Sequence, residues 1–197
     1  MDNQATPLTI PTFNDTVAFH GHACPGLALG YRVAIAAISK LRVNRDEDED
    51  LVAIVENDAC SVDAIQFVCG CTFGKGNLIF RDHGKQAYTF FNRTKKQGIR
   101  IYIEAPERDE SDGDQAKTLT PADERHQLIE LLLSLPEQDL LHITKAQEPP
   151  PAKASIHAST RCAVCGEQIM ETRAVQAKGQ TRCLPCAESP QSITKPN

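Results

Sequence analysis

The chain has 197 residues, of which 41% are apolar, and a formal net charge of −5 at pH 7. This length and composition allow one substantial core with a small second module and exclude two ordinary domains. The acidic balance argues against a protein whose whole surface coats nucleic acid or an anionic membrane. The apolar runs are far shorter than the roughly 20 residues that span a bilayer, and the N-terminus lacks the pattern of a secretory signal. We therefore expect a cytoplasmic protein without a membrane partner.

The first helix expected along the chain spans residues 25–41. Its buried stripe consists of apolar side chains at three- and four-residue spacing, namely Leu27, Tyr31, Ala34, Ile38 and Leu41. Pro25 suits the first helical position, and Cys24 would be the N-cap. The acidic run at residues 44–50 is expected to be a solvated turn, because adjacent like charges repel.

A strand and a second helix are expected next. The β-branched run L-V-A-I-V-E at residues 51–56 is short enough for a buried strand. A helix is predicted to begin at Cys60 or Ser61 and to end by Gly70. One side of this helix would carry Val62, Ile65, Gln66 and Cys69.

Three further strands are predicted at residues 77–80, 86–92 and 99–104. The segments that join them are short and rich in turn residues, which favours antiparallel pairing. His83 falls in one of these predicted hairpin turns and is assigned a structural role. The polar segment 107–117 is expected to be a mobile loop.

The last helix of the larger domain is predicted to begin after Thr120, with Pro121 at its first position and Asp123 at its third. It would extend to Leu135 with an inward face of Leu128, Leu131, Leu132 and Leu135. A short strand is expected at residues 140–144. These elements predict an α+β fold with an antiparallel or mixed sheet packed against helices.

The domain organisation is expected to have three parts. Residues 1–146 would form the α+β core. Residues 147–160 are rich in Pro and Ala and show no periodicity, which is typical of an extended linker. Residues 161–197 would form a small module and tail that cannot bury enough apolar surface to fold without help.

The small module contains two C-x-x-C pairs. They supply the thiols of Cys162, Cys165, Cys183 and Cys186. Four thiolates match the tetrahedral sulfur coordination that zinc prefers in closed structural sites. Disulfides would need an oxidising compartment, for which the chain shows no targeting segment. We therefore predict a structural Zn²⁺ ion that supplies most of the folding free energy of this module.

The densest group of reactive side chains lies in the motif F-H-G-H-A-C-P-G, which contains His20, His22 and Cys24. A second motif, E-N-D-A-C-S-V-D, also leads into a predicted helix, and its candidate side chains are Asp58, Cys60 and Asp63. If the two helix entrances converge, imidazole and thiolate groups could hold a second transition metal with an open coordination position. The structural alternative is that these cysteines and histidines only pack and form hydrogen bonds.

The segment V-C-G-C-T-F-G-K-G-N-L has only the composition of a phosphate loop. Its glycine spacing is wrong, and Gly76 stands where a magnesium-binding Ser or Thr should follow the lysine, so nucleotide hydrolysis is rejected. Lys75 is kept as a candidate contact for an anionic ligand, with a plain turn as the alternative. Cys69 and Cys71 are expected to pack inward.

Three motifs in this order, F-H-G-H-A-C-P-G-L-A-L-G-Y-R, E-N-D-A-C-S-V-D-A-I-Q and G-C-T-F-G-K-G-N-L, resemble the FmdE family, named after a component of formylmethanofuran dehydrogenase. The resemblance implies an α+β core that forms a homodimer and a metal-dependent or redox site. Carried over by position, the site residues are His20, His22, Cys24 and Cys60, with Asp58 and Asp63 beside them. The C-terminal module is similar to treble-clef fingers of the DksA/TraR kind.

The resemblance suggests an accessory protein of a molybdenum or tungsten formylmethanofuran or formate dehydrogenase system, with dehydrogenase subunits as partners. The chain cannot be the catalytic subunit by itself, because it lacks a ferredoxin-like cysteine run and has no room for a pterin domain. The alternative is a metal- or redox-sensing regulator whose finger contacts nucleic acid or a protein. The finger has a modest basic surface that leaves nucleic acid open, although the acidic chain argues against it. In a third interpretation, the finger bridges a dimer.

Overall fold

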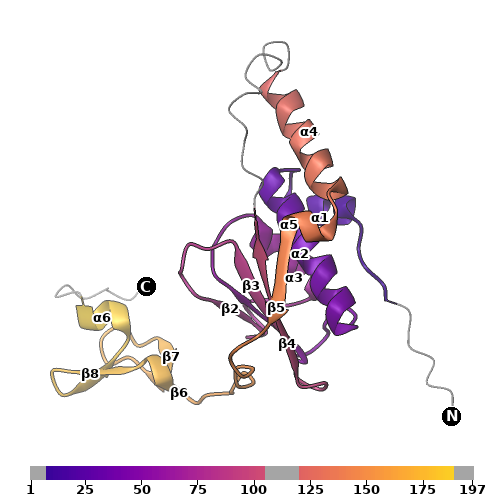
Figure 1. Ribbon diagram of the computed structural model, residues 1–197. Helices are drawn as coiled ribbons and strands as arrows, with labels where there is room; N and C mark the ends of the chain where they lie inside the picture. The colour runs from indigo at the N-terminus through magenta and orange to yellow at the C-terminus, as the bar shows by residue number, and fades with distance from the viewer. Residues whose placement is uncertain (1–7, 105–119, 189–197) are drawn as a thin grey trace. The chain divides into compact units, whose positions relative to one another are not determined.

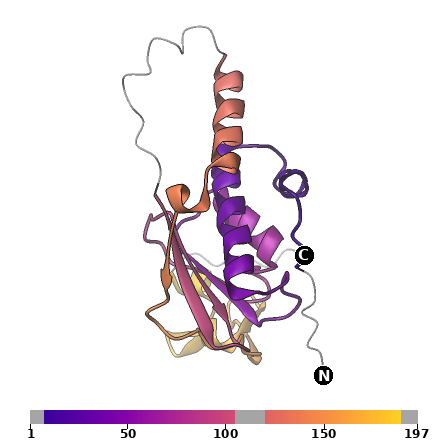
Figure 2. The same ribbon diagram turned by 45° about the vertical axis from the view of Figure 1, so that its right-hand side comes forward.

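The computed structural model describes residues 8–104 and 120–188, which divide into two compact units with a boundary between Ala154 and Ser155. The first unit contains a five-stranded sheet covered by helices, seen from two sides in Figures 1 and 2. The predicted α+β class with a mixed sheet is confirmed. The expected mobile loop at 107–117 lies outside the described residues. Within the two described ranges, every helix is too short or too polar to span a lipid bilayer.

The sheet has the strand order β2-β1-β3-β4-β5. Its strands are β1 (Leu51–Val55), β2 (Leu78–Phe80), β3 (Ala87–Asn92), β4 (Gln97–Ile103) and β5 (Leu141–Lys145). β1 and β2 run parallel, whereas the other neighbours are antiparallel. Every residue of β1 is buried. The burial of this strand agrees with its β-branched run, because a strand covered on both faces needs no alternation of polar residues.

The expected antiparallel pairing is confirmed for β3 and β4 but is wrong for β2 and β3, because β1 lies between them. Residues 81–86, and His83 among them, therefore cross the end of β1 and do not form a hairpin turn. In this crossing the N–H of Arg81 donates to the Val55 carbonyl at 2.9 Å, and the N–H of Lys85 donates to the Glu56 carbonyl at 3.0 Å. A short connection thus hides a strand order that turn length alone cannot indicate.

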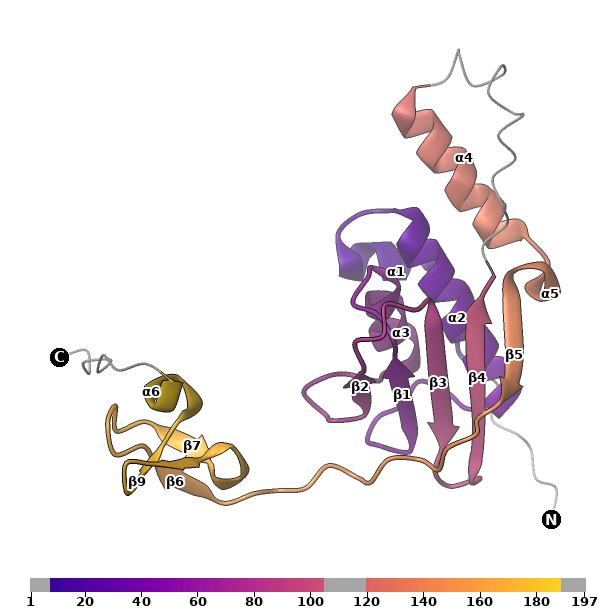
Figure 3. The ribbon, with the colours of Figure 1, turned by 60° about the vertical axis from the view of Figure 1, so that its left-hand side comes forward.

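Three helices pack on one face of the sheet (Figure 3), namely α1 (Phe13–His20), α2 (Pro25–Leu41) and α3 (Ser61–Cys69). α2 and α3 begin and end where the sequence predicts. Sequence reasoning missed α1, although a capping box marks its start. The Thr12 hydroxyl accepts the Asp15 N–H at 3.2 Å, and the Asp15 carboxylate accepts the Thr12 N–H at 2.9 Å.

The remaining helices of this unit are α4 (Pro121–Ser134) and α5 (Glu137–Leu140). α4 begins after its predicted N-cap, Thr120. Its buried side chains are Ile129 and Leu132, whereas Leu131 is 49% exposed, so the expectation that Leu131 faces inward is wrong. The reason is that α4 packs against α2, and Arg32 of α2 donates to the Leu132 carbonyl at 2.6 Å.

The face of the sheet that lies opposite the helices has a small core of its own. Val52, Ile54 and Phe91 are buried there, with Ala146 packed against them. The chain then continues along this unit, where three side chains hold residues 148–154. The contacts are the Arg81 pair with Glu148 at 2.7 and 2.8 Å, the Arg93 hydrogen bonds to the Pro151 and Ala152 carbonyls, and the Ala154 N–H to Glu49 at 2.9 Å. Part of the expected 147–160 linker is thus fixed to the core.

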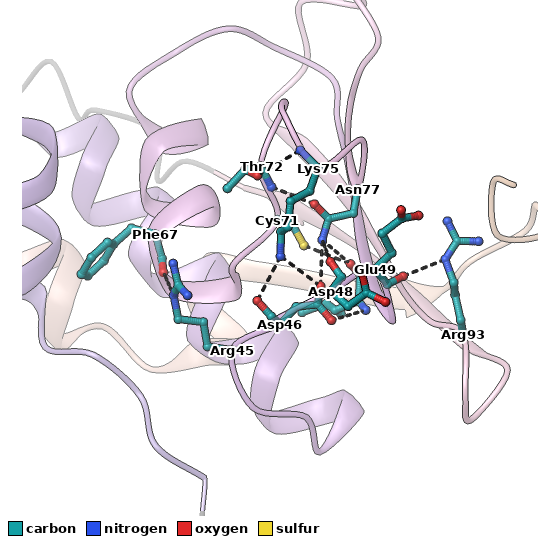
Figure 4. A network of polar contacts seen from close by, with 11 residues as sticks. Arg45, Asp46, Asp48, Glu49, Phe67, Cys71, Thr72, Lys75, Asn77 and Arg93 are labelled. Atoms are coloured by element: carbon teal, nitrogen blue, oxygen red, sulfur yellow. Dashed lines mark hydrogen bonds and ion pairs between the residues drawn. The ribbon is translucent and has the colours of Figure 1, made fainter. Parts of the chain in front are cut away.

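Asp46 corrects the expectation that the whole acidic run is solvated, because its side chain is buried. Figure 4 shows it at the centre of a polar network that joins three segments. Its carboxylate accepts the Leu51 N–H at 2.9 Å, the Asn77 amide at 2.9 Å and the Lys75 ammonium at 3.3 Å. One carboxylate therefore fixes the start of β1 to the loop that precedes β2, and this pairing compensates for its burial.

The second unit contains two small antiparallel sheets. Its elements are β6 (Ser159–Arg161), β7 (Gln168–Met170), the 3₁₀ helix η3 (Glu171–Arg173), β8 (Val175–Ala177), β9 (Gln180–Arg182) and α6 (Leu184–Glu188). β6 pairs with β7, and β8 pairs with β9. The buried cluster of this unit consists of its four cysteines, with Val164 and Ile169 packed against them.

We predict that Asp46→Ala lowers the free energy of unfolding by about 3 kcal/mol, because it leaves several buried donors without a charged acceptor. Denaturant unfolding followed by circular dichroism would measure this loss. Asp48→Ala is the matched control, because its side chain is exposed, and it should stay within about 0.5 kcal/mol of the wild type. Equal effects of the two substitutions would contradict a structural role for the Asp46 network.

Candidate metal sites

The four cysteines of the second unit converge on one point. Their sulfur atoms all lie within 4.8 Å of one another, and the Cys165 and Cys183 sulfurs are 3.9 Å apart. A zinc ion with tetrahedral Zn–S bonds of about 2.3 Å requires sulfur separations of about 3.8 Å, so the arrangement fits this ion. The same distance is almost twice that of a disulfide bond, about 2.05 Å.

Local backbone structure delivers these thiols. Cys162 directly follows β6, and its N–H donates to the Glu167 carbonyl at 2.9 Å to close the first turn. Cys183 directly follows β9, and Cys186 lies in α6. The two C-x-x-C turns therefore face each other from different elements, as a closed structural site requires.

The electrostatics of this cluster also favour a cation. Backbone N–H groups of Cys165 and Cys183 lower the pKa of Cys162 to about 6, so one thiolate forms readily. Hydrogen bonding to Cys183, together with burial, raises the pKa of Cys186 to about 12. Four adjacent sulfurs thus cannot all ionise by themselves, whereas a divalent ion among them would stabilise the thiolates.

A second cluster lies in the first unit, where one ligand atom each of His20, His22 and Cys24 lies within 4.8 Å of the others. His20 is the last residue of α1, and Cys24 is the N-cap of α2, with its sulfur accepting the Leu27 N–H at 3.4 Å. The tight connection between the two helices brings the three side chains together, and the two imidazole rings are 4.6 Å apart.

The hydrogen bonding of His20 leaves one ring nitrogen for a ligand. Its Nδ1 lies 2.7 Å from a carboxylate oxygen of Asp63 in α3. An ionised carboxylate only accepts hydrogen bonds, so Nδ1 carries the hydrogen and Nε2 presents a lone pair. That Nε2 is buried and has no hydrogen-bond partner in the described part of the chain. Metal-binding histidines usually have a carboxylate in this position, behind the ring nitrogen that does not bind the ion.

Asp63 is itself held in place, because the side chain of Gln66, one turn later in α3, donates to its second oxygen at 3.2 Å. The sequence placed Asp63 beside the site but gave no reason to pair it with His20, which is 43 positions away. Gln66 was not recognised as part of the site. An i to i+3 pair on a helix is the only sequence signal that could have suggested it.

Cys60 lies beside this cluster, at the N-cap position of α3. The two helices approach very closely, since a Cβ atom on Gly30 would come within 2.2 Å of the Ser61 carbonyl oxygen. One turn earlier, a Cβ on Gly26 would lie 3.3 Å from the Cβ of Cys60. Burial and the neighbouring Cys24 thiol raise the pKa of Cys60. Cys60 therefore interacts with Cys24 but is not one of the three mutually close ligand residues.

The other candidate residues are placed as follows. Asp58 is exposed on the loop before α3. Lys75 pairs with Asp46 at the start of β1, whereas Cys60 follows the end of that strand, so the structure does not bring Lys75 to the His/Cys cluster. Cys69 and Cys71 are fully buried as expected, and burial raises the pKa of both thiols well above the ordinary value.

Four surface hollows of about 190 to 500 Å³ lie elsewhere on the first unit. The two largest are lined by residues of α2, such as Tyr31 and Lys40, and none of the four is lined by the His/Cys cluster. The cluster is nevertheless the stronger candidate, because chemistry at a metal depends on ligand geometry and not on the volume of a hollow.

Comparison with known proteins gives two family matches. A model described as FmdE, molybdenum formylmethanofuran dehydrogenase operon, matches residues 19–142. A model described as a prokaryotic dksA/traR C4-type zinc finger matches residues 158–191. The second match, together with the four converging sulfurs, confirms the predicted C4 finger.

Two individual proteins are also similar to this chain. A protein of Archaeoglobus fulgidus described as a "Probable S-adenosyl-L-methionine-binding protein" is 34% identical over 193 residues, which cover 87% of this chain and 51% of that protein. The chain thus spans about half the length of this curated relative. A crystal structure of an FmdE-like protein of the tungsten formylmethanofuran dehydrogenase type, from Syntrophus aciditrophicus, has a TM-score of 0.61. It is 24% identical and covers 94% of this chain and 99% of its own, which shows a shared fold.

We predict that chelation of zinc unfolds the second unit and leaves the first intact, because the buried cluster of the second unit is built on its cysteines. In an amide NMR spectrum, the finger resonances should lose their dispersion while those of the sheet remain. Cys183→Ala should reproduce this effect without a chelator. Cys71→Ala, which removes a thiol of the first unit, should retain a dispersed finger, and a finger that stays folded without metal would contradict the prediction.

Proposed function

Because the chain belongs to the FmdE family, we propose that it is an accessory protein of a molybdenum or tungsten formylmethanofuran or formate dehydrogenase system. Its part in that system is to bind a transition-metal ion at the His/Cys cluster of the first unit. The observation that carries this proposal is the buried, unpartnered Nε2 of His20, which stands within reach of His22 and Cys24 while Asp63 holds the opposite nitrogen.

The donor set indicates the class of metal. Two imidazoles and one thiolate suit borderline and soft ions such as zinc, iron, cobalt or copper, whereas magnesium and calcium prefer oxygen donors. Three protein ligands leave a fourth position open for water or a ligand, as in catalytic zinc sites. The bound ion would supply Lewis-acid chemistry at this position.

The residues of the chain have distinct tasks in this arrangement. Asp63 keeps His20 in the tautomer that presents Nε2, and Gln66 fixes the second oxygen of Asp63. Cys24 combines two roles, because its sulfur caps α2 and also faces the two histidines. His22 is exposed, so the site is open to solvent on its side and can exchange ligands there.

The regulator hypothesis has less support. Within residues 155–188 the finger carries four basic and three acidic residues, so its charge gives little attraction for nucleic acid. The homodimer and the dehydrogenase subunits implied by the family resemblance stay predictions. The ligand named for the Archaeoglobus fulgidus relative is not part of this proposal, because about half of that protein has no counterpart in this chain.

We predict that the purified chain binds a second zinc or cobalt ion in addition to that of the finger. His20→Ala and Cys24→Ser should each remove the second ion, and serine keeps an oxygen that can cap α2. Asp63→Asn should weaken its binding by about 10- to 100-fold, because the ring of His20 loses its charged partner. Metal analysis after dialysis, followed by competition with a chelator, would measure these changes.

Asp82→Asn is the matched control for Asp63→Asn, because Asp82 is an exposed carboxylate of the same unit, and it should leave the affinity unchanged. A chain that binds only the ion of the finger under all conditions would disprove the proposed site. A second ion that survives both His20→Ala and Cys24→Ser would place it elsewhere.

The dehydrogenase role predicts a phenotype in the host cell. Loss of the chain should lower formylmethanofuran or formate dehydrogenase activity in cell extracts, and the wild-type chain should restore it. The Cys24→Ser variant should fail to restore activity although it accumulates to the same level, because it lacks a metal ligand. Unchanged activity without the chain would contradict the accessory role while leaving the metal site itself open to direct measurement.

A further inference from the structure

We propose that Cys24 and Cys60 form an oxidisable dithiol, so that a disulfide between them releases the metal from the His/Cys cluster. This inference rests on the proposed function, because it assigns Cys24 to the metal and gives the neighbouring Cys60 a separate task. It turns the site into one whose occupancy follows the thiol–disulfide state of the surroundings.

The geometry that carries the proposal is the packing of α3 against the first turns of α2. Gly30 lets the backbone of Ser61 come so close that any side chain at position 30 would collide with it. Cys60 precedes Ser61, and its Cβ lies against Gly26, only two residues after Cys24. The two thiols therefore interact although 36 positions separate them in the sequence.

The exposure of the cysteines makes this pair selective. Cys24 and Cys60 are half-buried, whereas the other six cysteines are buried. Cys69 and Cys71 have no exposed surface, and the four finger thiols would be occupied by zinc. A small oxidant in solution can therefore reach Cys60 most readily, because accessible thiols react first.

The chemistry balances with a low-molecular-weight disulfide as the oxidant. The Cys60 thiolate attacks one sulfur of this disulfide, its S–S bond breaks, and one small thiol leaves. The Cys24 sulfur then attacks the mixed disulfide on Cys60, which forms the Cys24–Cys60 bond and expels the second small thiol. The protein loses two electrons and two protons, and the oxidant is reduced to two thiols. A disulfide sulfur is no longer an anionic donor, so only two imidazoles remain for the metal.

The test uses the full chain loaded with zinc and treated anaerobically with increasing glutathione disulfide. A chromophoric zinc indicator follows release, and peptide mapping without reduction locates the cross-link. We expect the wild type to form the Cys24–Cys60 cross-link and to lose its core zinc in the same range of oxidant. Reduction with dithiothreitol should reverse both changes.

Cys60→Ser is the matched variant, because serine suits the start of α3 and the three mutually close ligand residues are retained. It should keep its core zinc at oxidant concentrations that empty the wild type, while release from the finger is the same in both. Equal release from both proteins, or release without the cross-link, would overturn the inference. A Cys60→Ser chain that cannot bind core zinc even before oxidation would make Cys60 a ligand and would also overturn it. That result leaves the proposed function intact, whereas a wild type without core zinc removes the proposed function itself.

Discussion

The close packing of α3 on α2 is the constraint on which the candidate site depends. Gly30 provides the space in which the Ser61 backbone lies, and this contact sets the position of every side chain at the start of α3. As a result Asp63 reaches His20, and Cys60 comes beside Cys24. A larger residue at position 30 would separate the helices, and the imidazole of His20 would lose the carboxylate that orients it.

The two cysteine-containing clusters illustrate opposite uses of the same ligands. In the finger, four sulfurs surround one point, so a bound ion is closed off and its role is to hold a small unit together. In the larger unit, two histidines and one cysteine meet at a helix junction, and one of the histidines is exposed to solvent. An ion bound there keeps a position for another ligand, which fits a part in the chemistry of a larger system.

Much of this arrangement could be predicted because its signals are local. The C-x-x-C turns and the motif that contains His20, His22 and Cys24 place their ligands within a few residues, so spacing alone indicates convergence. The pairing of Asp63 with His20 could not be predicted in this way, since it depends on how two helices pack. The burial of Asp46 was hidden for a related reason, because a run of like charges normally indicates solvent. Strand order failed at β2, where a short connection crosses a strand that comes earlier in the chain.

The most direct measurement of the central claim is anomalous X-ray scattering at the zinc edge from crystals of the full chain grown with zinc. Two peaks are expected for each chain, one among the sulfurs of the finger and one about 2.0 to 2.3 Å from His20 Nε2, His22 and Cys24. A single peak at the finger, with the His20 ring turned away from Asp63 to another partner, would contradict the metal site in the larger unit.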